Sequence, residues 1–339
     1  MGVRIRALVL MGDPASWEPG GLRDAMEGWA TRLSEAERLL RSAGLETWTL
    51  RISLAGLPGD DPALVERVAS AAPDGIMVSI GHTRRTDVLE AAAGRGLYSY
   101  FLMESISDAA RAAAAISRIS SANPEGATRV AVSVGGDVIH GPYFPMSSAI
   151  PGREVLAASI LYPSDVDPSS PERSIEDLFR RMEPALRAVD AVDYSLSPWM
   201  EESVARLIRL ISGSRVGEPG SMWAVGALNR AIRRSAARPI GFNEVMLPVE
   251  EDSELKEMAR EGSIRALDLL RMASVCVAGV DMAVVSAGER DLARFLMDSR
   301  EVALSARKPL GVRLIPVDGP PGSEVDLGKF GRAFAISLR

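Results

Sequence analysis

The chain has 339 residues, 47% of them hydrophobic, and a formal net charge of -6 at pH 7. This size allows a large buried core, either as two domains or as one α/β barrel. The mild acidity argues against nucleic acid as the main partner, because phosphate binding requires a basic face. The sequence has no apolar run long enough to span a bilayer, so we expect no membrane partner.

The predicted elements alternate between strand-like and helix-like hydrophobic patterns from the N-terminus onward. Strands are predicted at residues 3–11, 45–52, 75–80, 97–103, 129–134, 154–161, 192–196, 245–249, 280–285 and 312–317. Helices are predicted at residues 22–40, 61–72, 85–94, 105–121, 174–189, 201–212, 221–236, 253–272 and 289–306. Ser107 is a candidate N-cap, and Gly262 is a candidate break in the helix at 253–272.

This alternation predicts a parallel sheet covered by helices. A closed barrel and an open doubly wound sheet both fit about ten strands. No low-complexity linker separates the elements, so we expect a single domain over residues 1–339. Its Gly/Pro-rich tail, from about residue 318, is the one segment expected to be disordered.

The cellular setting can be inferred from residues that are rare or absent. The only cysteine, Cys276, excludes an intrachain disulfide and gives no sign of an oxidising compartment. The apolar stretch at 3–11 is too short for a signal peptide, so we expect a cytoplasmic protein. The sequence contains no Gln and only three Asn, which is typical of thermophiles, although coding bias toward Ala, Gly and Arg would produce the same depletion.

Both histidines follow predicted strands, at the ends where parallel α/β folds bind ligands. His82 comes after the strand at 75–80, and His140 comes after 129–134 in a loop that also contains Gly136 and Asp137. Either histidine can be a general base, a ligand-binding group, a metal ligand or a loop residue without a chemical task. The H-x-H and H-E-x-x-H spacings are absent, so the sequence leaves the presence of a metal open.

Two further groups of polar residues follow predicted strands. Asp193 and Ser195 lie on one face of the strand at 192–196, where they would bind substrate if that face points inward. Alternatively, Asp193 is an ordinary loop acid and Ser197 caps the next helix. Glu250, Glu251 and Asp252 follow the short strand at 245–249; we expect one functional acid, Glu251 or Glu250, and one helix cap, Asp252 or Ser253.

The last third of the chain places charged or reactive groups in apolar segments. Cys276 is a candidate nucleophile, or inert core. Asp281 lies inside an apolar strand and therefore requires a charged or hydrogen-bonding partner, for which Arg313 in the last strand is the candidate. The pair is either a structural ion pair or an anion-binding Arg oriented by Asp281. The dinucleotide and P-loop fingerprints are absent, and the sequence leaves open whether the protein uses any cofactor.

Several motifs together resemble the domain of unknown function 711 family. They are G-P-Y-F-P (141–145), V-D-Y-S-L-S-P (192–198), G-S-M-W-A-V-G-A-L (220–228), G-F-N-E-V-M-L-P-V-E-E-D-S-E-L (241–255), C-V-A-G-V-D-M (276–282) and G-V-R-L-I-P-V-D-G (311–319). The resemblance implies a single ten-stranded α/β barrel of the pyruvate formate-lyase-like fold, with helices outside, and a homodimer. It implies no activity, and the tail G-K-F-G-R-A-F-A lacks the motif of glycyl-radical enzymes, so radical chemistry is not expected.

Some positions carry the family pattern and others depart from it. The matching positions are Glu251, Asp252, Cys276, Gly279, Asp281, Met282 and Arg313. The segment 286–289 replaces a P-G-D-T-like turn of the family, and His82 stands where the family more often has Pro.

Three functional hypotheses follow from these residues. The first is an enzyme that acts on a small anionic or carbonyl-bearing metabolite as a lyase, isomerase or hydrolase. Its acid/base or nucleophilic groups would be Asp281, Glu251, Cys276 and His140, and its substrate-binding groups would be Arg313, Asp193, Ser195, Gly136 and His82. The second is a small-molecule-binding regulatory protein, and the third is a metalloenzyme with at least three ligands.

Overall fold

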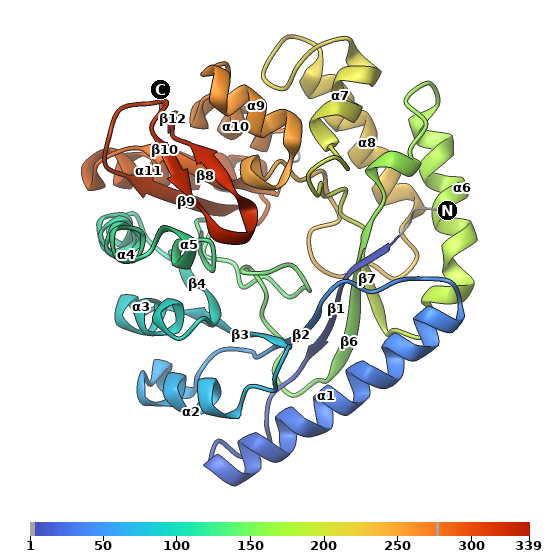
Figure 1. Cartoon of the computed structure of the whole chain (residues 1–339), viewed down its shortest axis with the longest axis vertical. Helices are drawn as coiled ribbons and strands as arrows, with labels where there is room; N and C mark the ends of the chain where they lie inside the picture. The colour runs from blue at the N-terminus through green and yellow to red at the C-terminus, as the bar shows by residue number, and fades with distance from the viewer. Residues whose placement is uncertain (1–3, 276–277) are drawn as a thin grey trace.

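The computed structural model describes residues 4–275 and 278–339. They form a mixed α/β structure around a ten-stranded sheet, in the order β12-β8-β9-β5-β4-β3-β2-β1-β6-β7. Figure 1 shows the strands toward the middle of the molecule and helices along its outside. Among the described residues, no helix is both long and apolar enough to cross a membrane.

The strands of the large sheet are short. They are β1 (Arg4–Met11), β2 (Leu50–Ser53), β3 (Met77–Thr83), β4 (Tyr98–Leu102), β5 (Val130–Ser133), β6 (Val155–Leu161), β7 (Ala191–Asp193), β8 (Gly279–Ser286), β9 (Gly311–Val317) and β12 (Ile336–Ser337). A separate two-stranded sheet contains β10 (Glu324–Asp326) and β11 (Arg332–Phe334).

Helices follow most of the strands. They are α1 (Pro19–Ser42), α2 (Ala63–Ala71), α3 (Thr86–Gly94), α4 (Asp108–Ala122), α5 (Pro124–Ala127), α6 (Pro171–Leu186), α7 (Val204–Ser212), α8 (Ser221–Ser235), α9 (Ser253–Glu261), α10 (Ala266–Ala273) and α11 (Glu289–Ala306). Short 3₁₀ turns are η1 (Pro58–Asp60), η2 (Pro163–Asp165), η3 (Val249–Glu251) and η4 (Gly328–Phe330).

The sheet is not wholly parallel, which corrects the sequence-based expectation. Strands β1 to β5 run parallel to one another, but β6 pairs antiparallel with β1, and β9 pairs antiparallel with β5. The long segment between β5 and β6 contains no helix, so it does not supply the crossover that a parallel return needs. The carboxyl ends of the two groups of strands therefore lie at opposite edges of the sheet.

Residues 239–249 lie between β7, at one end of the strand order, and β8, next to the other end. Single β-bridges join Val192 in β7 with Pro239, and Leu196 with Val245. Another bridge joins Pro248 with Asp281 in β8. The predicted strand at 245–249 thus forms isolated bridges followed by η3, rather than a regular strand.

The two faces of the sheet are both buried. On β1, Leu8 and Leu10 pack with α1 in the main core between the sheet and the helices, whereas Val9 and Met11 belong to a smaller apolar cluster on the other face. We call this second face the inner face. The loop residues 141–149 are all buried, and Phe144 packs in the inner-face cluster. A buried loop is unusual, because its backbone polar groups need partners away from water.

Three local predictions have clear outcomes. Gly262 ends α9 in a left-handed conformation, so the predicted break in the helix at 253–272 is confirmed. Ser107 occupies the N-cap position of α4, as predicted, but its side chain forms no capping hydrogen bond. The tail is ordered rather than disordered, since it contains β10, β11 and β12 and buries Phe330.

Candidate functional site

Asp281 and Arg313 lie on neighbouring strands and form a bidentate ion pair. The Nε and Nη2 atoms of Arg313 donate to the two carboxylate oxygens of Asp281 at 2.6 and 3.0 Å. The remaining guanidinium nitrogen, Nη1, donates to the backbone oxygen of Thr128 at 3.2 Å. This fork-to-fork geometry fixes the orientation of both side chains.

Glu251 links this pair to Arg6 on β1. One carboxylate oxygen of Glu251 accepts from Arg313 Nη2 at 3.0 Å, and the other accepts from Arg6. Burial alone would raise the pKa of Glu251, but the two guanidinium groups outweigh it and hold that pKa below its ordinary value. Glu251 is therefore held as an anion that joins two arginines.

The pKa of Asp281 is shifted in the opposite direction from that of Glu251. Burial raises the pKa of its carboxyl above the ordinary value, with the nearby negative charge of Glu251 adding to the effect, despite the attraction of Arg313. Its side chain nevertheless remains 23% exposed, compared with 5% for Arg313 and 5% for Glu251. Asp281 is thus the one carboxylate of this ion-pair chain that a small molecule could reach.

A cavity of about 30 Å³ adjoins Asp281 and Arg313. One water molecule needs roughly 10–15 Å³ on this measure, so the cavity holds only a few non-hydrogen atoms. Its wall is mainly apolar, and its lining residues are Tyr143, Phe144, Pro145, Met146, Phe242, Met246, Leu247, Ala278, Gly279, Asp281, Gly311 and Arg313. The buried loop at 141–149 therefore supplies one side of the pocket.

Tyr143 carries an unused hydrogen-bonding group in this wall. Burial raises the pKa of Tyr143 to about 12, so its hydroxyl remains protonated near neutral pH. The hydroxyl has no hydrogen-bond partner among the residues that the structure describes. Ser197 lies close enough to affect that pKa, but the two hydroxyls do not form a hydrogen bond. A ligand that accepts a hydrogen bond would satisfy Tyr143.

The backbone is strained next to Asp281. The pairing register of β8 with β9 breaks between Val280 and Ala283, and Met282 has a φ of 51°. A positive φ is unfavourable for a side chain of this size, and such strain is concentrated at functional sites. Similar register breaks flank Arg6 on β1 and lie directly before His82 on β3. Bulges of this kind redirect a side chain out of the regular alternation.

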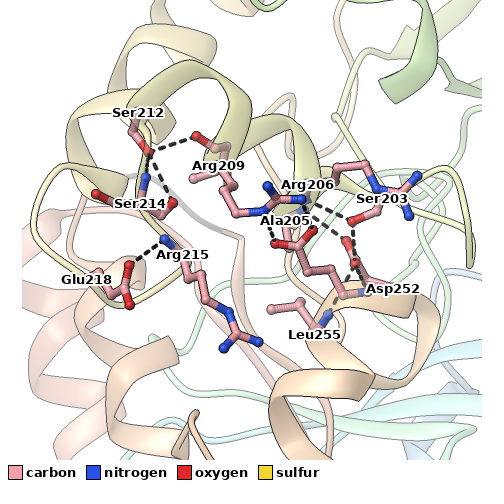
Figure 2. Close-up of polar contacts among 12 residues, drawn as sticks. Ser203, Ala205, Arg206, Arg209, Ser212, Ser214, Arg215, Glu218, Asp252 and Leu255 are labelled. Carbon is pink, nitrogen blue, oxygen red and sulfur yellow. Dashed lines mark hydrogen bonds and ion pairs between the residues drawn. The ribbon is translucent and has the colours of Figure 1, made fainter.

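The three consecutive acids after Val249 have three different environments. Asp252 caps α9 by accepting the N–H groups of Glu254 and Leu255, and it also accepts from Ser203 and from the N–H of Ala205 (Figure 2). The predicted cap is therefore confirmed. Asp252 joins the starts of two helices, since Ser203 itself caps α7.

Glu250 is buried but takes no part in the pairing of Glu251 with the arginines. Its carboxylate forms no hydrogen bond among the described residues and lies 3.4 Å from Lys256 Nζ. Burial raises the pKa of Glu250 to about 7, although Lys256 opposes this effect.

Both histidines contact the buried loop at 141–149 and lie outside the pocket beside Asp281. Ser148 Oγ lies 3.3 Å from His82 Nδ1 and 2.9 Å from the Tyr100 hydroxyl. His140 Nδ1 donates to the backbone oxygens of Ser148 and Ala149, at 3.2 and 3.0 Å. Burial, with Arg84 adding to it, lowers the pKa of His82. Neither histidine lines the cavity beside Asp281.

Asp193 and Ser195 are hydrogen-bonded to each other and to the turn that precedes the 245–249 segment. Asp193 accepts from Ser195 Oγ at 2.5 Å and from the N–H groups of Phe242 and Asn243. Burial raises the pKa of Asp193. This network positions Phe242, a pocket residue, but neither Asp193 nor Ser195 lines the cavity.

The remaining predicted residues are outside this pocket or outside the described chain. Gly136 has a φ of 82° and lies beside Met103 and Glu104, and it does not line the cavity. Cys276 falls outside the described residues. Among the residues that are described, no group of three or more His, Cys, Asp or Glu side chains could hold a metal ion.

Sequence reasoning missed Arg6, Arg51 and Tyr143. A usable signal was present for Arg6, which stands in the apolar strand R-I-R-A-L-V-L-M and therefore needs a buried partner. Arg51 occupies a comparable position in L-R-I-S. For Tyr143, the signal was the motif G-P-Y-F-P itself, whose burial the sequence does not reveal.

Comparison with known proteins finds a family match for one segment in the second half of the chain. Residues 180–328 match the model of the family described as "Uncharacterised ACR (DUF711)". The relatives named "UPF0210 protein" include one from Sulfurisphaera tokodaii, 36% identical over 145 residues, which are 40% of this chain and 33% of the relative. One from Pyrobaculum arsenaticum is 37% identical over 159 residues, 44% of this chain and 36% of the relative. One from Lacticaseibacillus paracasei is 33% identical over 155 residues, 43% of this chain and 33% of the relative.

The resemblance predicted from the motifs is thus confirmed: residues 180–328 match the DUF711 family. The matched segment spans about a third of the length of these relatives. Their names state no activity. Relatives in thermophilic archaea accord with the depletion of amides, while the growth temperature of the source of this chain stays a prediction.

Proposed function

We propose that the protein is an enzyme that moves a proton to or from a small anionic or carbonyl-bearing metabolite, with Asp281 as the acid/base group. The observation that carries this proposal is the environment of Asp281: it lines a small cavity, its pKa is raised, and the backbone beside it is strained. A carboxyl group whose pKa is raised by burial is a common acid/base group in enzymes.

The neighbouring charges have positioning roles in this proposal. Arg313 orients Asp281 and faces the cavity, where it can bind an anionic substrate group. Glu251 is paired with two arginines, so it holds them in place and does not transfer protons. Cys276 precedes the pocket residues Ala278 and Gly279 in the sequence, and its role as a nucleophile stays a prediction.

The same proposal includes the architecture around the pocket. We propose that the ten-stranded sheet closes into a barrel through residues 239–249, with residues 1–339 forming one domain. The bridges from Val192 and Leu196 on one side, and from Asp281 on the other, support this closure. The buried loop at 141–149 would then lie inside the barrel. A homodimer and a cytoplasmic location stay predictions.

An exchange experiment tests the enzyme proposal without knowledge of the reaction. The full chain is incubated in D₂O with a panel of short 2-oxo acids, 3-oxo acids and aldehydes, and loss of C–H signals is followed by NMR. We expect deuterium incorporation into at least one compound. Asp281→Asn should slow the exchange by about 10² or more, the usual contribution of a general base.

Asp326→Asn is the control, because Asp326 lies on the exposed two-stranded sheet and should leave the rate unchanged. Exchange that persists in Asp281→Asn would show that Asp281 is not the acid/base group. If wild-type protein exchanges none of the compounds yet binds some of them, the protein is better described as a small-molecule-binding regulatory protein. The pairing of Glu251 with two arginines and the mainly apolar cavity wall favour that second candidate.

A further inference from the structure

The four ion-paired side chains that lead to the cavity carry no net charge together. Glu251 pairs with both Arg6 and Arg313, and Arg313 pairs in turn with Asp281 at the cavity. Two guanidinium groups thus face two carboxylates, so each charge in this chain of ion pairs already has an opposite partner. A ligand anion would have to compete with Glu251 or Asp281 for an arginine that is already paired.

The hydrogen-bonding capacity of Arg313 is also nearly used up. Its N–H groups donate to both carboxylate oxygens of Asp281, to Glu251 and to the backbone oxygen of Thr128. A guanidinium group has five N–H donors, so these four bonds leave one. Arginine usually holds a carboxylate through two parallel hydrogen bonds, which Arg313 could form only by releasing one of its present partners. The cavity is therefore better suited to an uncharged group than to an anion.

Tyr143 provides an unused donor in the wall of the cavity. The residue lines the cavity and is only 7% exposed, and its hydroxyl has no partner among the residues that the structure describes. Its ring packs against the chain of ion pairs, since the guanidinium carbon of Arg6 lies 5.7 Å from the ring centre. A buried hydroxyl without a partner is unfavourable until an acceptor binds. The carbonyl oxygen of an uncharged molecule is such an acceptor.

The rest of the wall suits carbon atoms. Side chains such as Met146, Phe242 and Leu247 make it mainly apolar. The volume of about 30 Å³ limits the group that enters to a carbonyl and the carbons next to it. The cavity thus combines a carboxylate, an unused hydroxyl donor and an apolar lining.

We propose that the substrate is a short uncharged ketone or aldehyde, whose carbonyl oxygen accepts a hydrogen bond from Tyr143 while Asp281 removes a proton from the adjacent carbon. This inference rests on the proposed function, because it names the substrate class and a second catalytic residue for the same pocket. In the step, the C–H bond breaks and its proton forms an O–H bond with the Asp281 carboxylate. The electron pair of the C–H bond forms a C=C bond, and the carbonyl oxygen receives the negative charge of an enolate.

The same step changes the charge of the chain of ion pairs in the direction that an enolate requires. Once Asp281 is protonated, Arg6 and Arg313 face only the carboxylate of Glu251, so the chain carries one positive charge beside the one negative charge of the enolate. An uncharged substrate therefore meets a neutral site before the step and a cationic site after it. Attraction that appears only as charge develops accelerates the reaction, whereas a substrate carboxylate would bring a second negative charge that the site does not balance.

The first test compares pyruvamide with pyruvate, which have the same shape and the same ketone but differ in charge. The full wild-type chain is incubated with each compound in D₂O at pH 7, and exchange of the methyl hydrogens is followed by NMR relative to exchange in buffer alone. We expect the protein to accelerate exchange of pyruvamide at least tenfold more than that of pyruvate. Equal or greater acceleration of pyruvate exchange overturns the substrate class.

Tyr143→Phe then tests the second residue. We expect pyruvamide exchange to slow by about 10²-fold, the usual effect of removing one oxyanion donor. The loss should fall on kcat more than on KM, because the oxygen gains its charge only during the step. The midpoint of thermal unfolding should not fall, since the lost hydroxyl has no partner in the described part of the chain. Exchange within twofold of the wild-type rate overturns the role of Tyr143.

Tyr162→Phe is the matched control with the opposite expected result. The Tyr162 hydroxyl donates to the backbone oxygen of Tyr194 at 2.7 Å, and Tyr162 does not line the cavity. This variant should lower the midpoint of thermal unfolding and leave pyruvamide exchange unchanged. If Tyr143→Phe lowers the midpoint as much as Tyr162→Phe does, the Tyr143 hydroxyl has a structural partner and the inference fails. If Tyr143→Phe does not fold, the comparison of pyruvamide with pyruvate still decides the substrate class.

Binding measurements separate this inference from the enzyme proposal. If an oxo acid exchanges in an Asp281-dependent way but pyruvamide does not, the acid/base role stands and the uncharged substrate is rejected. Calorimetry covers the case in which wild-type protein exchanges none of the compounds. Tighter binding of pyruvamide than of pyruvate by at least tenfold, with the difference lost in Tyr143→Phe, would then support the uncharged-carbonyl site and reject the acid/base role. Equal or absent binding of the two compounds, again without exchange, overturns both.

Discussion

Two of the buried polar clusters in the described part of the chain differ in how their groups are satisfied. In the charged cluster, Arg6, Glu251, Arg313 and Asp281 form a chain of ion pairs that ends at a carboxyl group open to a cavity. In the histidine cluster, Ser148 connects His82 with Tyr100, and the backbone of the same loop binds His140. A hydroxyl beside the charged cluster, that of Tyr143, has no hydrogen-bond partner among the described residues, whereas the side chains of the histidine cluster are extensively hydrogen-bonded. Only the charged cluster therefore has an evident need for a ligand.

The largest expected effect tests whether the charged cluster is a single unit. Arg313→Met leaves Asp281 unpaired and Glu251 with only Arg6, both in a buried setting. Breaking a buried ion pair by removing one partner costs about 3–5 kcal/mol, so we expect a loss of that size in the free energy of unfolding. Chemical denaturation measures it.

Arg173→Met is the control for this variant, because its side chain is 86% exposed in a surface pair with Asp177. A surface pair contributes at most about 1 kcal/mol. If Arg313→Met costs no more than Arg173→Met, the carboxylates are not held by Arg313 in solution, and the contrast between the two clusters disappears.

A second prediction asks where the charged cluster ends along the chain. Glu250 is next to Glu251 in sequence, but its pKa is raised to about 7 from 4.5, so the folded state binds a proton more tightly than the unfolded chain. Its contribution to stability is therefore full below pH 4.5 and is lost as pH rises through about 7. Between pH 5 and pH 8 the free energy of unfolding should fall by about 2 kcal/mol from this group.

Urea denaturation at several pH values measures this dependence, and Glu250→Gln should remove it. Glu301→Gln changes an exposed acid, with a side chain 66% exposed, and should retain the wild-type dependence. An unchanged pH dependence in Glu250→Gln would mean that Lys256, at 3.4 Å, keeps Glu250 ionised. Glu250 would then belong with the charged groups after all.

The sequence predicted local features well, because they depend on neighbouring residues. The helix break at Gly262 and the cap at Asp252 follow from backbone freedom and short-range hydrogen bonds. The Asp281–Arg313 ion pair was also predictable, since each residue stands inside an apolar strand and needs a buried partner. These inferences did not depend on the direction of the sheet.

Long-range placement could not be predicted in the same way. The rule that ligands bind at the carboxyl ends of strands assumed a parallel sheet, but β6 and β9 pair antiparallel with their neighbours in the first group of strands. His82 in β3 and Asp281 in β8 therefore lie on strands that run in opposite directions. Arg6 and Glu251 are 245 residues apart in sequence, and no local pattern shows that they meet.

The smallest expected effect concerns His82 in the histidine cluster. Burial and Arg84 lower its pKa below 6.5, so His82 should be neutral at pH 7, and NMR titration of its ring protons should give a value below that of an unstructured histidine. Because the folded-state pKa is lower than the unfolded one, the stability from neutral His82 is present above pH 6.5 and is lost as pH falls. His82→Asn should change the rate of deuterium exchange less than twofold, since His82 does not line the cavity. The loss in the free energy of unfolding of His82→Asn should be about 1 kcal/mol, the usual contribution of one hydrogen bond.

A loss of exchange in His82→Asn as large as that in Asp281→Asn would transfer the chemistry from the charged cluster to the loop at Ser148, because a neutral imidazole beside a hydroxyl is itself an acid/base pair.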